Sequence, residues 1–190
     1  MLLYMMEINF SPFPVLKSGR LTLREITSAD VDAVFALRSD PDTMRYIPRP
    51  LAKNTEDALT LIGTFEEMLI KKECINWAIT LSDNEKLLVG MICLIRIQPE
   101  NFRTEVGYIL HPDFRGKGIM LEAVNRIVKY AFADLKFHTL EAVIDPRNIA
   151  SQKVLDAAGF IREGLFKDKV YYNGQFLDSA VYSMLNADES

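Results

Sequence analysis

Cysteine, histidine and long apolar runs are all scarce in this chain, and each scarcity excludes a class of protein. The two cysteines, Cys74 and Cys93, are too few for a disulfide framework, so a reducing compartment suits the chain. The apolar start MLLYMMEINF has no basic region and no small-residue cleavage site, and Glu7 interrupts it. No run approaches the roughly 18 apolar residues that cross a bilayer. We therefore expect a cytoplasmic protein with no membrane partner.

A concentration of positive charge is also missing. The formal net charge is -4 and the pI about 5.3, and no zinc-finger, helix-turn-helix or RNA-recognition pattern occurs. We expect no nucleic-acid partner. The two histidines, His111 and His138, do not stand at metal-ligand spacing from cysteines or carboxylates, so we expect no metal site.

The chain does have enough apolar sequence for one folded domain. It holds 190 residues, of which 49% are hydrophobic, and a chain of this length buries roughly 70% of its unfolded surface. The periodicity predicts a mixed α/β sheet with helices on both faces, in which one strand–helix–strand unit makes two neighbouring strands parallel. The expected elements are strand Leu21–Ile26, a helix from a Thr27–Asp30 capping box to Ser39, a loop Pro41–Lys53, a helix capped by Asn54 or Thr55 with the apolar stripe Leu59, Ile62, Phe65, Met68 and Leu69, a hairpin of Ile75–Leu81 and Lys86–Ile97 around Asp83-Asn84, strand Thr104–Leu110, a helix from Gly116 to about Ala133, strand Thr139–Ile144, helix Asn148–Ala158 ended by Gly159, and two strands around Asn173-Gly174.

The segment YILHPDFRGKGIML, residues 108–121, carries the clearest functional pattern. An apolar strand enters a turn, passes through Arg115-Gly116-Lys117-Gly118 and continues into an amphipathic helix. Free backbone N–H groups and the positive end of the helix dipole then converge on one point, which suits a phosphate-bearing ligand. The P-loop and dinucleotide-fold patterns do not match this segment.

Two motifs in this order resemble those of the GNAT acetyltransferases. The first is the pyrophosphate loop [RQ]-x-x-G-x-[GA], matched by Arg115 and Gly118, with Met120 in place of Gly or Ala. The second, Asn148–Phe160, is similar to N-x-x-[AS]-x-x-x-[YL]-x-x-x-G-F. Leu155 stands where many members carry a Tyr that protonates the departing thiolate. Together with Ser151, this Leu resembles the ribosomal-protein N-terminal alanine and serine acetyltransferases, as do the segments RLTLR, EVGY and YNGQFLD.

This resemblance implies a GNAT fold for residues 20–187, with a mostly antiparallel sheet and a parallel pair of central strands. Residues 1–19 would form an N-terminal arm or an extra strand. The cosubstrate would be acetyl-CoA. Its binding residues would be Tyr108, Ile109 and Leu110 for pantetheine pairing, Arg115, Gly116, Lys117, Gly118, Ile119 and Met120 for the phosphates, and Asn148 and Ser151 for the pantetheine arm and the sulfur.

Direct attack of an amine on a thioester calls for a base and is helped by a proton donor. Glu105 is the candidate base, and strand alternation places it on the face of Gly107 and Ile109; the alternative is a structural pair with Arg103 or Arg96. Ser151 is the candidate donor, unless it is a simple first-turn serine.

Tyr172 and Asp178 are candidates for the acceptor pocket, although a hairpin tyrosine is also typical of surface packing. His111 could act as a base but better suits a backbone turn before the loop. We expect the acceptor region in the loop of residues 40–54 and the turn of residues 166–174.

The sequence leaves three functions open. The first is acetylation of a protein N-terminal α-amine, and the second is acetylation of a small amine such as a polyamine, an aminoglycoside or an amino acid. The third is an acyl-CoA-binding module without catalysis. The apolar N-terminal stretch is consistent with packing against a second copy, so a homodimer is a further expectation.

Overall fold

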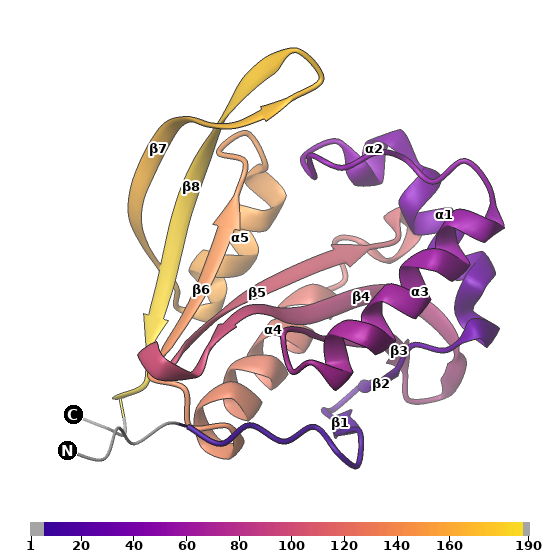
Figure 1. The fold of residues 1–190 in the computed structure, drawn as a ribbon, viewed down its shortest axis with the longest axis horizontal. Coiled ribbons are helices and arrows are strands. Elements are labelled where there is room, and N and C mark those ends of the chain that lie inside the picture. Colours follow the sequence, from indigo (N-terminus) through magenta and orange to yellow (C-terminus); the bar gives the residue numbers. More distant parts are fainter. Residues whose placement is uncertain (1–5, 188–190) are drawn as a thin grey trace.

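The computed structural model describes residues 6–187 and shows one sheet of eight strands (Figure 1). Its order is β1-β2-β3-β4-β5-β6-β8-β7, and every neighbouring pair is antiparallel except β5–β6. This confirms the predicted mixed sheet with one parallel pair. The strands are β1 (Leu16–Lys17), β2 (Leu21–Glu25), β3 (Ile75–Leu81), β4 (Asn84–Gln98), β5 (Arg103–Leu110), β6 (Thr139–Ile144), β7 (Ile161–Tyr172) and β8 (Gln175–Leu185).

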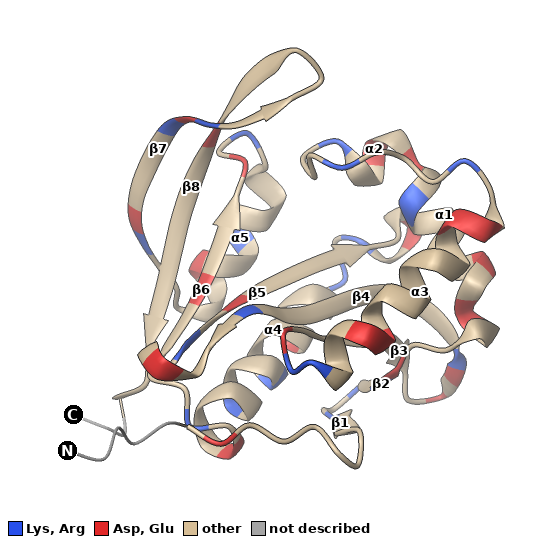
Figure 2. Ribbon diagram, viewed as in Figure 1, with Lys and Arg blue, Asp and Glu red and all other residues tan. Residues whose placement is uncertain are grey.

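Helices cover both faces of the sheet. The main helices are α1 (Val31–Ser39), α2 (Pro41–Met44), α3 (Thr55–Ile70), α4 (Ile119–Lys129) and α5 (Ile149–Ala158). One buried cluster joins α1, α2 and α3 to the sheet face of Ala78, Met91 and Ile109. The other cluster joins α4 and α5 to the opposite face, which includes Val106. Lys and Arg are interspersed with Asp and Glu over both layers (Figure 2).

The segment before β1 packs on the face that α4 covers. Met6, Ile8 and Phe10 are buried there, and the indole N–H of Trp77 donates to the carbonyl of Pro14 at 2.8 Å. The first five residues of the predicted N-terminal arm lie outside the described residues, and the domain boundary at residue 20 stays a prediction. Within residues 6–187, no helix is long and apolar enough to cross a membrane.

Several predicted local details were wrong, each for a local reason. Leu59 is 44% exposed, because α3 buries the stripe that begins at Ala58 and Ile62 instead. The expected loop 41–53 contains the short helix α2, which Asp40 caps by accepting from the backbone N–H of Thr43. The first hairpin turns at residues 82–83, since Leu81 pairs with Asn84.

The central helix is also shorter than predicted. It begins at Ile119, after the short 3₁₀ turn Pro112–Phe114, and Gly118 is its N-cap. It ends as an α-helix at Lys129 and continues as the π-helical turn Tyr130–Asp134. The shorter helix places its N-terminus directly at the carboxyl end of β5.

Candidate active site

The central strands β5 and β6 part in the middle of the sheet (Figure 1). Their parallel register covers only Arg103↔Thr139, Thr104↔Leu140 and Glu105↔Glu141. On its other side, β5 stays paired with β4 as far as Leu110. Residues 106–110 therefore keep one backbone edge without a strand partner among the described residues. Unpaired N–H and C=O groups of this kind are a template for an extended ligand, and the predicted Tyr108, Ile109 and Leu110 lie along this edge.

The turn after β5 leads to the N-terminus of α4, and two glycines shape the backbone of this turn. Gly116 and Gly118 have φ of +72° and +73°, which is left-handed backbone that favours glycine. The next residues, Ile119 and Met120, are both buried in the core cluster, with Met120 only 6% exposed. The side chain of Met120 therefore fills the core instead of the space before the helix. The free N–H groups at the first turn of an α-helix are donors of the kind that bind anions, so the predicted phosphate site at α4 stays a prediction.

Two arginines hold this loop in place. Arg115 donates to the carbonyl of Leu110 at 3.3 Å and to the hydroxyl of Thr43 on α2 at 2.9 Å. Arg20 donates to the carbonyl of Lys117 at 3.1 Å and to the Glu122 carboxylate at 2.7 Å. Arg20 had no predicted role, although it begins the RLTLR segment. The remaining loop cation, Lys117, lies 5.3 Å from the centre of the Phe114 ring.

Asn148, Ser151 and Tyr108 meet where α5 begins. The side-chain oxygen of Asn148 caps α5 by accepting from the N–H of Ser151 at 3.1 Å. The buried hydroxyl of Ser151 lies 2.7 Å from the hydroxyl of Tyr108. Burial raises the pKa of Tyr108 to about 12, against the opposing hydrogen bond from Ser151. Tyr108 is therefore a protonated phenol at neutral pH and a ready hydrogen-bond partner for the serine. Leu155 is fully buried in the core.

Glu105 lies at the last paired position before the two strands part. Its side chain is on the face of Gly107 and Ile109, opposite Tyr108. It is 7% exposed, and its carboxylate accepts from the Arg96 guanidinium at 2.6 Å. Burial raises the pKa of Glu105, and the positive charge of Arg96 opposes the rise. Arg103 pairs instead with Glu141. Glu105 is thus both the partner of Arg96 and a buried carboxylate at the branch point.

Comparison with known proteins shows the family. The model of the acetyltransferase (GNAT) domain matches residues 20–161. The chain belongs to the GNAT acetyltransferase family. The "Probable N-acetyltransferase YjcK" of Bacillus subtilis is 39% identical over 182 residues, covering 92% of this chain and 99% of that protein.

Solved structures agree with this assignment. A GNAT-family acetyltransferase from Bacillus anthracis is 29% identical with a TM-score of 0.81, over 91% of this chain and 99% of that one. The ribosomal-protein-S5-alanine acetyltransferase from Vibrio fischeri is 25% identical with a TM-score of 0.78, over 93% of this chain and 99% of that one. This GNAT enzyme is therefore an N-acetyltransferase.

The two predicted acceptor residues of the acetyltransferase lie apart from Glu105. Asp178 on β8 accepts from the backbone N–H of Asp168 at 2.9 Å, at the irregular part of β7. The Asp145 carboxylate, and to a smaller extent the charge of Asp178, raise the pKa of the Arg147 guanidinium. Tyr172 pairs with Gln175 at the end of the hairpin. His111 begins the 3₁₀ turn and accepts from the N–H of Asp113, as a turn residue does.

The structure adds residues that the sequence reasoning missed. Thr43 and Arg20 hold the loop, and Tyr108 contributes its side chain as well as its backbone. Arg20 begins the RLTLR segment and Tyr108 ends EVGY, but no local pattern signalled Thr43, because it contacts Arg115, which is far from it in the chain.

Proposed function

We propose that this acetyltransferase moves the acetyl group of acetyl-CoA to the N-terminal α-amine of a protein, such as a ribosomal protein. The observation that carries the proposal is the environment of Glu105, a buried carboxylate paired with Arg96 at the strand branch point. Burial raises its pKa and Arg96 limits that rise, so the base is of moderate strength. An α-ammonium group, with a pKa of about 7.7–8.0, yields its proton to such a base more readily than an alkylammonium near 10.4.

The charges near Glu105 favour the same acceptor. Arg96 contacts the carboxylate directly. A polyamine would bring several positive charges toward this arginine, whereas a peptide N-terminus brings only one. The similarity to the S5-alanine acetyltransferase from Vibrio fischeri also supports a peptide acceptor.

The cosubstrate would follow the edge of β5. Its diphosphate lies on the backbone N–H groups of residues 115–120, and the pantetheine pairs with Tyr108, Ile109 and Leu110. The capping position of Asn148 brings the start of α5 beside this edge through the Ser151–Tyr108 contact. The thioester then lies between Glu105 on one face of the sheet and Ser151 on the other.

The reaction is a direct transfer. Glu105 takes a proton from the α-ammonium, and the amine nitrogen bonds to the thioester carbonyl carbon. A free N–H of β5 stabilises the negative charge on the oxygen. The carbon–sulfur bond then breaks, and the proton that the nitrogen loses on becoming an amide passes to the departing thiolate through the Ser151 hydroxyl, which the Tyr108 phenol holds in place. Because a free thiol has a pKa near 8.5, this last protonation helps the reaction without being indispensable.

An acceptor panel tests the proposal. Release of free thiol from acetyl-CoA is measured with peptides that begin with Ala or Ser, with the same peptides blocked at the N-terminus, with spermidine and with an aminoglycoside. We expect the free peptides to give the highest kcat/KM and the blocked peptides to give none. Faster turnover with spermidine or the aminoglycoside would replace the peptide acceptor with a small amine. Tight coenzyme A binding without thiol release from any acceptor would indicate a binding module.

A further inference from the structure

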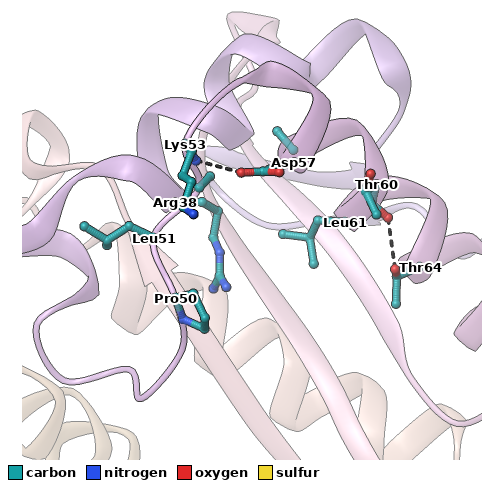
Figure 3. Close-up of a pocket in the computed structure, with 10 residues that line it drawn as sticks. Arg38, Pro50, Leu51, Lys53, Asp57, Thr60, Leu61 and Thr64 are labelled. Carbon is teal, nitrogen blue, oxygen red and sulfur yellow. Dashed lines mark hydrogen bonds between the residues drawn. The ribbon is translucent and has the colours of Figure 1, made fainter. Parts of the chain in front are cut away.

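A cavity of about 400 Å³ lies on the α1–α3 layer (Figure 3). Its walls are the last turn of α1, the first half of α3 and the segment between α2 and α3. Apolar side chains form half of the wall, and polar or charged side chains form the other half; the apolar ones are Pro50, Leu51, Ala52, Ala58 and Leu61. The volume is within the range of roughly 300–1,000 Å³ that is typical of small-molecule sites.

Arg38 is the polar group that distinguishes this cavity. Its guanidinium extends toward Pro50 between Leu51 and Leu61 (Figure 3). Two other half-buried arginines each have a carboxylate partner: Arg24 pairs with Asp30, and Arg103 with Glu141. Within residues 6–187, the guanidinium of Arg38 makes no hydrogen bond or ion pair.

Arg38 has no ion-pair partner among the described residues, and its partial burial disfavours the charged form. Burial lowers the pKa of Arg38, and the positive charge of Arg49 lowers it further. Asp57 also lines the cavity, but its carboxylate accepts from the backbone N–H of Lys53 at 2.8 Å. This hydrogen bond joins the segment between α2 and α3 to the first turn of α3. An anion bound at Arg38 would relieve the desolvation of the guanidinium and the repulsion between the two arginines.

The remaining polar groups narrow the chemistry of this anion. The hydroxyls of Thr60 and Thr64 each donate to a backbone carbonyl of their own helix at 2.9 Å, so their protons are already used. Lys53 also lines the cavity, so the cavity offers two cations, Arg38 and Lys53, together with an apolar wall. This arrangement fits a compact anion with a short hydrocarbon body better than a sugar or a polyamine.

We propose that this cavity is a binding site for a small aliphatic carboxylate, with the carboxylate on Arg38 and the hydrocarbon against Leu51, Ala58 and Leu61. The lining residues do not include the predicted coenzyme A loop, residues 115–120, but they include residues 50–53 of the predicted acceptor region. The cavity is tied to the segment that follows α2, because the N–H of Ala52 donates to the carbonyl of Arg38 at 3.0 Å. A ligand here would brace α1, α3 and that segment together.

Titration of the whole protein, saturated with coenzyme A, tests the site. The probes are isovalerate and its neutral analogue isovaleramide, at constant ionic strength, with binding followed by calorimetry. We expect isovalerate to bind at least about tenfold more tightly than the amide, since a charge-assisted hydrogen bond of this kind is worth roughly one to two powers of ten in affinity. Equal binding of the two probes, or no saturable binding of isovalerate, would overturn the proposal.

Two variants locate the site. Arg38→Gln should weaken isovalerate binding by about tenfold or more and leave the affinity for coenzyme A unchanged, which also shows that the variant is folded. Arg162→Gln, at an exposed arginine of β7, is the matched control and should bind isovalerate like the natural protein. Isovalerate binding that is unchanged in Arg38→Gln would place the site elsewhere. If Arg38→Gln does not fold, the comparison of acid and amide on the natural protein decides.

Discussion

At the scale of single residues, Glu105 carries the strongest prediction. Glu105→Gln should lower kcat by about 10²–10⁴-fold, the usual contribution of a general base, without weakening coenzyme A binding. Because the base must be ionised and burial raises its pKa, the activity of the natural enzyme should rise with pH through that raised pKa. The variant should lose this acidic limb in a pH profile of kcat/KM.

Glu141→Gln is the matched control for this variant. Glu141 is the register partner of Glu105 on β6 and pairs with Arg103. If both variants keep the natural rate and pH profile, Glu105 is only the structural partner of Arg96. If both lose activity equally, the effect comes from the sheet and not from a base.

Ser151 should matter less than Glu105. Ser151→Ala removes the hydroxyl beside Tyr108, and we expect kcat to fall about tenfold, below the usual range for an indispensable proton donor. Tyr108→Phe leaves the serine in place and should cost less. Since the pKa of Tyr108 is about 12, its phenol should add no limb to the pH profile below pH 10. Natural kcat in Ser151→Ala, measured by thiol release, would remove Ser151 from the mechanism.

The sequence predicted the face of Glu105 but could not choose its partner. Arg96 and Arg103 were equally acceptable neighbours. A register shift between Ile95 and Gln98 places Arg96 in left-handed backbone, with φ of +49°, and its guanidinium reaches Glu105. Such a bulge has no distinct sequence signal here, because arginine is not a residue that favours this conformation.

At the scale of elements, the loop before α4 gives a prediction for Gly118. A Cβ at this position would meet Arg20 at an ordinary contact of 3.5 Å, so the cost of Gly118→Ala is mainly backbone strain at φ +73°. We expect a loss of about 1–2 kcal/mol in the free energy of unfolding. Because the strain shifts the N–H groups that face the diphosphate, KM for acetyl-CoA should rise while kcat changes little.

Gly174→Ala separates the two effects. Gly174 has a similar φ of +78° in the β7–β8 turn and nothing within 4 Å of the added Cβ. It should lose comparable stability by denaturant unfolding and keep the natural KM. A natural KM in Gly118→Ala as well would show that the loop geometry does not control cosubstrate binding.

Strand periodicity and turn residues predicted most elements, and the failures have a common origin. The stripe Ala58, Ile62, Phe65 and Leu69 repeats as well as the predicted one that includes Leu59, and packing against α1 and the sheet selected it. In the same way, Met120 departs from the loop motif but fills the core below the helix. Helical spacing defines a set of faces, and the neighbouring elements decide which face is buried.

At the scale of the whole molecule, two motifs in order were enough to predict the sheet with its parallel pair. The order of the eight strands and the path of residues 6–15 beneath Trp77 depend on long-range contacts that no local pattern records. The sequence could not predict the cavity beside Arg38 for the same reason. A homodimer and a cytoplasmic location stay predictions.

The parting of β5 and β6 has a consequence for the enzyme without its cosubstrate. A central strand whose backbone is half unsatisfied resembles the exposed border of a sheet, which attracts foreign strands and favours aggregation. Bound acetyl-CoA would pair with this open backbone edge. At a concentration of 100 times its Kd, it would raise the free energy of unfolding by about 2.7 kcal/mol. If the proposed thioester site is correct, the stability of the protein would depend on the concentration of coenzyme A.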